Sequence, residues 1–357
     1  MEGEATSART HQWRLPLSTT KTGVLQGGNF MQIMQTRLTQ MLDIEHPVML
    51  AGMGGVSYHG LVAAVSEAGG FGCLGASTMS TDGMVEEMRK VRELTAKPFG
   101  VDLLTAMPGD MAAQVEKIIQ GGASVFVAGL GIPIEVVELC HRHGLLVINM
   151  CGRVDHARRA VDAGCDIVVA QGTEAGGHTG LIATMPLVPQ IVDAVGHQVP
   201  VVAAGGISDG RGLAAALSLG ADGVWVGTRF IATPEARAVL GYKDALLATA
   251  EDGTTISRAY SGKTMRVVRN TYTAYYDEHP DKLERFPGQL GRSMAEKAFH
   301  LGGDAQTQEV DPARECYPAG QGVGAIHELV PAADLVRRFV TEASEALTRA
   351  TAVTTGA

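Results

Sequence analysis

The chain has 357 residues, of which 45 are glycine, and a formal net charge of −9. Its hydrophobic (45%) and charged (19%) fractions exclude a disordered or fibrous protein, and the acidic balance argues against nucleic acid or an anionic membrane as partner. No segment approaches the roughly 18 apolar residues of a membrane helix, and the five cysteines lack metal-ligand spacing, which favours reduced thiols in a cytoplasmic protein without a metal site.

The first part of the chain, residues 1–30, differs in composition from the rest. It is rich in Ser, Thr, Gly and Gln and has no hydrophobic run of signal-peptide length. We expect a disordered or loosely attached extension, with Met31 as an alternative start.

Residues 31–240 repeat one unit, in which a short apolar run is followed by a turn and an amphipathic helix. This alternation predicts a parallel sheet, and eight such runs favour a (β/α)8 TIM barrel over a doubly wound sheet. The runs are apolar throughout, as expected where both faces of a strand are buried. The predicted strands are Val48–Leu50, Phe71–Leu74, Phe99–Leu103, Ser124–Ala128, Leu145–Met150, Ile167–Ala170, Val199–Ala203 and Gly223–Val226. The predicted helices include Leu61–Ala68, Met84–Leu94, Met111–Gln120, Ile134–Arg142, His156–Ala163 and Arg211–Leu219.

After the eighth strand the regular alternation ends. Residues 241–324 contain helical patterns and polar loops, and we expect a smaller, mainly helical cap domain inserted over the barrel mouth. Four tyrosines of this region either line a substrate entrance or pack in a core: Tyr260, Tyr272, Tyr275 and Tyr276. In the final part, residues 325–357, the amphipathic run Leu329–Leu347 predicts a helix that returns to the barrel.

The active site of such a barrel lies at the carboxyl ends of its strands, and phosphate binds after strands seven and eight. Gly205 and Gly206 follow strand seven, and Gly227 and Thr228 follow strand eight, so freed backbone N–H groups can bind an anion there. The loop 51–57 after strand one is also rich in glycine and lets backbone approach a flat ring. Chain turning alone is the alternative explanation for these glycines.

Two ionisable residues stand out at this end of the barrel. His178 lies in a glycine-rich loop after strand six and suits proton transfer near neutral pH, although a lone histidine is more often structural. We expect Glu174 to orient that loop through hydrogen bonds. Asp102 ends strand three, where a carboxylate is costly unless it is hydrogen-bonded, so a ring N–H or a ribityl hydroxyl is a candidate partner. Asn149, at the end of strand five, is a lesser candidate of the same kind.

Several segments together resemble the nitronate monooxygenase family, formerly called 2-nitropropane dioxygenase, whose members depend on FMN. The resemblance covers about residues 36–330, and its most specific part is Gln171–His178. The family is related to FMN-containing enoyl-ACP reductases, to which Thr254–Ser257 and Val267–Asn270 are similar. Gln171 and Ala319–Gln321 are more similar to the monooxygenases. The matching segments are Ala51–Met53 with Ser57, Phe99–Val101, Ala170–His178, Ala204–Ile207, Val226–Phe230 and Ala319–Gln321.

The resemblance implies a set of site residues. His178 would be catalytic, and Ser57 and Gln321 would contact substrate. The position of Asp102 is usually Asn in the family, and a carboxylate accepts but does not donate unless it is protonated. The residues implied to bind FMN are Ala51, Gly52, Met53, Asp102, Gln171, Gly176, Gly177, Gly205, Gly206, Trp225, Val226, Gly227 and Thr228.

The implied reaction is oxidation of alkyl nitronates or nitroalkanes with O2 to a carbonyl compound and nitrite, with His178 near the charge or removing the α-proton. The alternative is an NAD(P)H-dependent FMN enoyl thioester reductase, and the third reading is a non-catalytic flavin-binding barrel. The expected partners are a small-molecule substrate and O2, with neither nucleic acid nor membrane. The sequence leaves the oligomeric state open, a homodimer included.

Overall fold

The computed structural model of this chain describes residues 34–105, 109–131 and 134–355. The predicted extension, residues 1–30, and the alternative start at Met31 lie outside the described residues.

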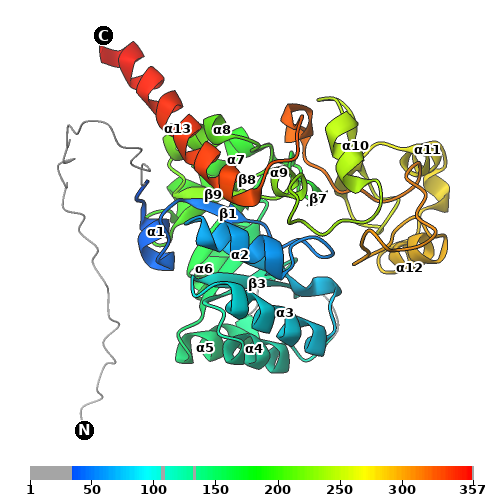
Figure 1. The fold of residues 1–357 in the computed structure, drawn as a ribbon, viewed down its shortest axis with the longest axis horizontal. Helices are drawn as coiled ribbons and strands as arrows, with labels where there is room; N and C mark the ends of the chain where they lie inside the picture. Colours follow the sequence, from blue (N-terminus) through cyan, green and yellow to red (C-terminus); the bar gives the residue numbers. More distant parts are fainter. Residues whose placement is uncertain (1–33, 106–108, 132–133, 356–357) are drawn as a thin grey trace. The chain divides into compact units, whose positions relative to one another are not determined.

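Eight parallel strands form the centre of the fold (Figure 1). Their order in the sheet is β1-β9-β8-β6-β5-β4-β3-β2. A parallel bridge between Met49 and Phe71 joins the two edge strands, so the sheet closes into a barrel. The predicted (β/α)8 TIM barrel is thereby confirmed, and each predicted strand is present within two residues of its expected bounds. The strands are β1 (Val48–Leu50), β2 (Gly72–Gly75), β3 (Phe99–Leu104), β4 (Val125–Gly129), β5 (Leu146–Cys151), β6 (Ile167–Gln171), β8 (Val201–Ala204) and β9 (Gly223–Val226).

Helices flank the barrel strands, as Figure 1 shows. Side-chain caps set several of their starts: Ser80 accepts a hydrogen bond from the N–H of Gly83 at 3.1 Å, so α3 begins at Thr81, earlier than predicted. Asp110 caps α4 in the same way, at 3.0 Å from the nitrogen of Ala113. The helices of this part are α1 (Arg37–Leu42), α2 (His59–Glu67), α3 (Thr81–Leu94), α4 (Met111–Gln120), α5 (Ile134–Arg142), α6 (Val154–Asp162), α7 (Thr184–Val195), α8 (Gly210–Ser218) and α9 (Thr228–Ile231), with a short 3-10 turn at Ala76–Thr78.

The apolar strand residues divide between two cores. Val48 and Leu50 of β1 pack with the helices, whereas Met49 between them joins a second cluster with Phe71 and Trp225 inside the barrel. This division follows from the alternation of side chains along a strand, and it explains why the strands are apolar on both faces.

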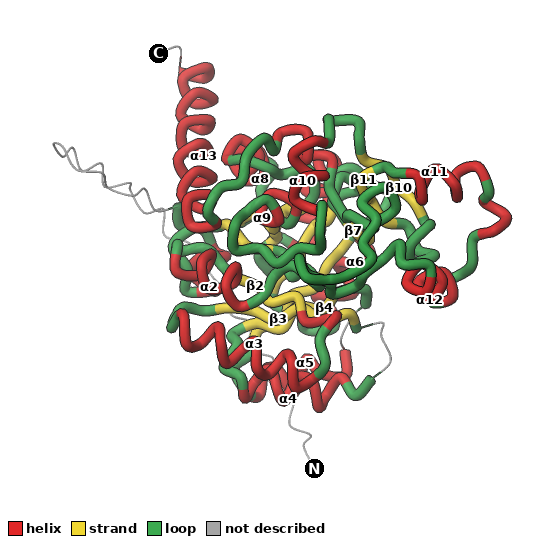
Figure 2. Tube along the Cα trace, turned by 45° about the vertical axis from the view of Figure 1, so that its right-hand side comes forward, coloured by secondary structure: helices red, strands yellow, loops and turns green. Residues whose placement is uncertain are grey.

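The region 241–324 contains more than the helices predicted for it. Strands β10 (Thr254–Ser257) and β11 (Met265–Val268) form an antiparallel pair, and β11 also pairs with β7 (Gly177–His178), as Figure 2 shows. This sheet is not predicted from the sequence, because strands of four and two residues are too short to be distinguished from loops by their periodicity. The remaining elements are α10 (Tyr242–Ala248), α11 (Thr271–Glu278), α12 (Gly288–Ala295) and 3-10 turns at Pro280–Lys282 and Gln321–Ala325.

The four tyrosines of this region divide into three that are buried and one that is exposed. Tyr260, Tyr272 and Tyr276 are buried in one hydrophobic cluster, whereas Tyr275 is 44% exposed. None of the four lines the cavity described below. Core packing, the second of the two roles considered for them, therefore holds for three of the four.

The last helix, α13 (Ala332–Thr355), packs on α8 (Figure 1). It begins later than predicted because proline disfavours helical backbone in the residue before it, and Pro331 directly precedes Ala332. A Cβ on Gly210 would lie 2.4 Å from the carbonyl oxygen of Phe339, so glycine permits the close approach of the two helices. Among the described residues, no helix combines the length and the apolar character needed to cross a bilayer.

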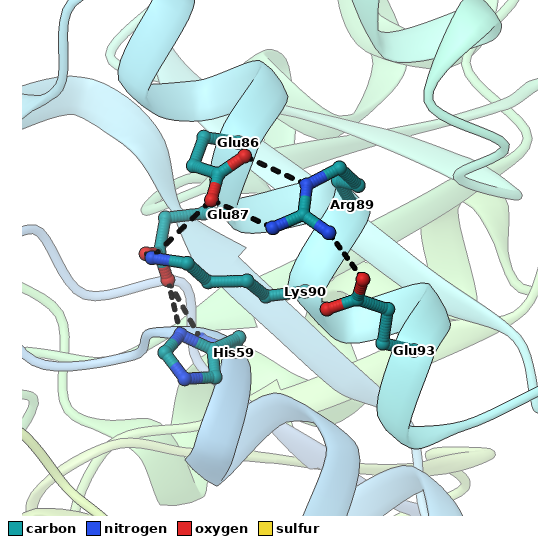
Figure 3. Close-up of polar contacts among 6 residues, drawn as sticks. All are labelled: His59, Glu86, Glu87, Arg89, Lys90 and Glu93. Atoms are coloured by element: carbon teal, nitrogen blue, oxygen red, sulfur yellow. Dashed lines mark hydrogen bonds and ion pairs between the residues drawn. The ribbon is translucent and has the colours of Figure 1, made fainter.

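Charged side chains on the outer helices are paired with one another, as Figure 3 shows for α2 and α3. Glu87 accepts hydrogen bonds from the backbone N–H of His59 at 3.1 Å and from Lys90 Nζ at 3.1 Å, and it lies 2.7 Å from His59 Nδ1. On the same helix Arg89 forms ion pairs with Glu86 and Glu93. The contacts between His59 and Glu87 join the start of α2 to α3, and the others lie within α3.

Candidate active site

A cavity of about 1340 Å³ opens at the carboxyl ends of the barrel strands. The loops after the strands form its floor, and the turn between β10 and β11, residues 258–264, contributes one of its walls. Parallel barrels place their ligands at this end, so the position agrees with the predicted site.

Glycines shape the side of the cavity that follows β8 and β9. Gly205 and Gly206 have φ of 105° and 73°, a conformation that residues with a side chain rarely adopt. A Cβ on Gly205 would also lie 2.8 Å from Thr184 Oγ1. Both glycines line the cavity together with Gly227 and Thr228. Their backbone can therefore approach a ligand closely.

Asp102 lies under the loop that follows β1. Asp102 is 7% exposed. A Cβ on Gly52 would lie 2.2 Å from the Cβ of Asp102, so the glycine leaves room for the aspartate side chain. Its Oδ1 has no hydrogen-bond partner among the described residues. Burial raises the pKa of Asp102 well above its usual range and so favours the neutral carboxyl form, which can donate a hydrogen bond as well as accept one.

Both the backbone and the ring of His178 are held by contacts within the chain. It belongs to β7, where it pairs with Met265 of β11, and its carbonyl oxygen accepts a hydrogen bond from Gln171 Nε2 at 2.7 Å. Its ring Nε2 lies 3.0 Å from Ser261 Oγ. Burial, and secondarily the charge of Lys263, lower the pKa of His178 to about 4, so the ring is neutral at pH 7.

The loop before His178 is fixed by Glu174, as expected. The carboxylate accepts hydrogen bonds from the backbone N–H and the hydroxyl of Thr184, at 2.8 and 2.9 Å. Its backbone oxygen accepts from the N–H of Gln321 at 2.9 Å, and the N–H of Gly320 donates to Thr228 Oγ1 at 2.9 Å. The segment 319–321 therefore ties the loops after β6 and β9 together.

Most of the predicted site residues line this one cavity, and three do not. Val226 is buried in the core, and the side chain of Gln321 is exposed outside the cavity. Ser57 is completely buried, and its hydroxyl accepts a hydrogen bond from the N–H of Met53 at 2.7 Å. The predicted residues that line the cavity are Ala51, Gly52, Met53, Asp102, Gln171, Gly176, Gly177, His178, Gly205, Gly206, Trp225, Gly227 and Thr228, and Asn149 joins them.

The sequence analysis missed the cavity residues of the β10–β11 turn, among them Arg258, Ser261 and Lys263. Ser261-Gly262-Lys263 between two short apolar runs is a hairpin signal, but it does not reveal that the turn faces His178 across 83 positions. Among the described residues, no group of three or more His, Cys, Asp or Glu side chains could hold a metal ion.

The chain is similar to known proteins in both sequence and fold. The family model described as nitronate monooxygenase matches residues 35–117 and 105–342. The chain is 41% identical over 237 residues, 66% of each chain, to the (3aS,4S,5R,7aS)-5-hydroxy-7a-methyl-1-oxo-octahydro-1H-indene-4-carboxyl-CoA dehydrogenase of Mycobacterium tuberculosis. The structure of FabK from Thermotoga maritima aligns with a TM-score of 0.80 at 32% identity, covering 90% of this chain and 99% of that one. A nitroalkane oxidase from Streptomyces ansochromogenes aligns with a TM-score of 0.76 at 32% identity, covering 87% and 99%.

Proposed function

Because this chain belongs to the nitronate monooxygenase family, we propose that it oxidises alkyl nitronates and nitroalkanes with O2 to a carbonyl compound and nitrite. The family and its solved neighbours are flavoenzymes, so the chain is a flavin-dependent oxidoreductase, and FMN is the flavin we propose. The observation that carries the proposal is the neutral, half-buried His178 in the wall of a cavity that suits a flavin.

The residues present fit a phosphate-bearing flavin. Gly205, Gly206 and Gly227 offer backbone where a side chain would fill the space, which suits the phosphate. Asp102 offers an unpartnered buried oxygen, which suits a polar edge of the ring system. When bound, the flavin supplies the electron transfer, and the chain supplies position and electrostatics.

The proposed role of His178 follows from its hydrogen bonds. Ser261 Oγ lies 3.3 Å from the carbonyl oxygen of Lys263, to which its hydroxyl can donate. Ser261 Oγ then accepts from the Nε2–H of His178, and this assignment leaves Nδ1 with a lone pair. Nδ1 has no hydrogen-bond partner among the described residues, and it is the atom we propose to take the α-proton of a neutral nitroalkane.

A second candidate function is NAD(P)H-dependent reduction of an enoyl thioester. The cavity of about 1340 Å³ favours it: it is larger than the roughly 300–1,000 Å³ of common small-molecule pockets, so beside the flavin it offers room for a substrate larger than a nitroalkane. FabK, an enoyl-ACP reductase, is a solved neighbour, and the dehydrogenase relative is named for a carboxyl-CoA compound. In this reaction His178 would orient the thioester or protonate its α-carbon.

An anaerobic spectrum of the purified, flavin-loaded protein tests the proposal. Alkyl nitronate is expected to change the visible absorbance of the flavin, and NAD(P)H is expected to leave it unchanged. Bleaching by NAD(P)H, with recovery on addition of an enoyl thioester, would establish the reductase instead. Turnover of neither substrate class by the aerobic protein would leave the non-catalytic flavin-binding barrel.

A further inference from the structure

The turn between β10 and β11, residues 258–264, is built to a fixed geometry. Gly262 has a φ of 79°, and a Cβ there would lie 2.6 Å from the backbone nitrogen of Phe286. Arg258 Nε donates a hydrogen bond to the carbonyl oxygen of Gly262 at 3.0 Å. The turn therefore presents the residues that follow Gly262 to the cavity in a defined position.

Lys263 brings a positive charge without a counter-charge into this wall. Its Nζ lies 4.3 Å from the centre of the Phe286 ring, which holds the ammonium group by a cation–π contact. Among the residues that the structure describes, no carboxylate pairs with Lys263, and no hydrogen bond is made by its Nζ. Lys90, Lys97 and Lys297, in contrast, form ion pairs with glutamates.

Most other cations that line the cavity are engaged. Arg229 donates to the carbonyl oxygen of Glu328 at 3.0 Å, and Arg153 pairs with Asp155 at 2.8 Å. Arg159 is unpaired within the described chain but lies exposed on α6. Lys263 is half-buried, and its charge reaches His178 strongly enough to lower the pKa of that imidazole.

The side chains of His178 and Lys263 thus differ in how strongly they can attract an anion. His178 is neutral at pH 7 and offers no charge, whereas the ammonium of Lys263 offers a full charge at the same wall. Desolvated cations attract anionic ligands more strongly than solvated ones. We propose that Lys263 is the substrate-binding residue that holds the anionic oxygens of an alkyl nitronate, while His178 takes the α-proton only when the substrate is the neutral nitroalkane. This assignment rests on the proposed function for the identity of the anion.

Replacement of the charge tests the assignment in the flavin-loaded protein. Lys263→Met is expected to raise KM for an alkyl nitronate about 10- to 100-fold, the range for losing a charged hydrogen bond, with a much smaller change in kcat. KM for the neutral nitroalkane should change less than about threefold, since it carries no net charge. Lys263→Arg should keep most of the affinity. Lys282→Met is the matched control, because it removes an exposed lysine of the same region.

Two measurements that do not need turnover complete the test. Nitrite, titrated into the flavin-loaded protein and followed by the flavin spectrum, should bind at least tenfold more weakly to Lys263→Met than to wild type or Lys282→Met. The imidazole of His178, titrated by NMR, should show a higher pKa in Lys263→Met and an unchanged one in Lys263→Arg. Lys263→Gln replaces Lys263→Met if the latter does not fold.

The outcomes separate the two proposals. Unchanged nitronate KM and nitrite affinity in Lys263→Met and Lys263→Gln would overturn the role of Lys263 while leaving nitronate oxidation in place. A wild type that does not oxidise nitronates, but whose nitrite binding depends on Lys263, would overturn the proposed substrate and support an anion site at this residue.

Discussion

Two buried carboxyl groups show how the outer helices differ from the cavity. Glu87, on α3 beside the start of α2, is 8% exposed, and Asp102, at the cavity, is 7% exposed. Burial raises the pKa of Glu87, but the hydrogen bonds from His59 and Lys90 outweigh it and the net pKa is lowered. Burial acts on Asp102 without such partners, and its pKa is raised.

The histidines of the two regions also differ in the groups that they contact. His59 Nδ1 lies 2.7 Å from a carboxylate oxygen of Glu87. His178 instead contacts the hydroxyl of Ser261, and the positive charge of Lys263 lowers its pKa. Polar groups on the outer helices thus find their partners within the chain. At the cavity, Asp102 Oδ1 and Thr78 Oγ1 are buried without a hydrogen-bond partner among the described residues. Unpartnered buried polar atoms at a cavity suit contact with a ligand.

Of the substitutions considered, replacement of His178 at the cavity should have the largest effect, and the effect should be on turnover. His178→Asn removes the proton acceptor, so turnover of a neutral nitroalkane should fall about 10²- to 10⁴-fold, the usual contribution of general base catalysis. Steady-state rates with the nitroalkane and with its preformed nitronate measure the effect. Wild-type activity on the nitroalkane should fall as the pH approaches about 4, because the imidazole becomes protonated there.

The preformed nitronate is the internal control for this variant. It has already lost its α-proton, so His178→Asn should affect its turnover far less. An equal loss on both substrates would contradict the role of His178 as the base.

A smaller effect is expected from Asp102→Asn, which gives the buried side chain a donor that does not depend on pH. In the wild type the pKa of Asp102 is higher in the folded chain than in the unfolded one. Its contribution to stability is therefore present at acid pH and is lost as the pH rises through the folded-state pKa.

The flavin-free Asp102→Asn protein should accordingly gain unfolding free energy over wild type at pH 8, by about 1.4 kcal/mol for each unit by which burial raises the pKa of Asp102, because the amide stays neutral at every pH. The gain should shrink toward pH 4. Urea unfolding at several pH values measures it, and a gain that is independent of pH would show that Asp102 does not change its protonation on folding.

The smallest effect is expected on the outer helices. Glu87→Gln should lower the unfolding free energy by about 1 kcal/mol at pH 7 by weakening the contacts with His59 and Lys90. Because the folded-state pKa of Glu87 is lowered, its contribution is present above the ordinary carboxyl pKa and is lost as the pH falls through the folded-state value.

Urea unfolding at pH 7 and at acid pH measures the effect of Glu87→Gln, and flavin binding should not change. Arg89→Ala, which removes exposed ion pairs on the same helix, is the control and should leave stability within error. A loss in Glu87→Gln no larger than in Arg89→Ala would show that burial gives the Glu87 contacts no extra strength.

The sequence determined the barrel and the glycine-rich part of the site. A strand of a parallel barrel is buried on both faces, and that leaves a local signal in apolar runs such as Val48–Leu50. The turns that follow β8 and β9 need glycine for local reasons, such as the positive φ of Gly206. Such strands and turns can be predicted from the sequence because the residues that cause their conformation lie within a few positions of one another in the chain.

Only the tertiary structure decided which side chains meet at the cavity. The sheet of β7, β10 and β11 joins His178 to a turn 83 positions away, and that pairing brings Ser261 and Lys263 to the imidazole. The tertiary structure also turned Ser57 inward and left Asp102 Oδ1 without a partner in the part of the chain that the structure describes. Burial and the sum of neighbouring charges set the pKa values of these groups, and both depend on contacts between residues far apart in the sequence.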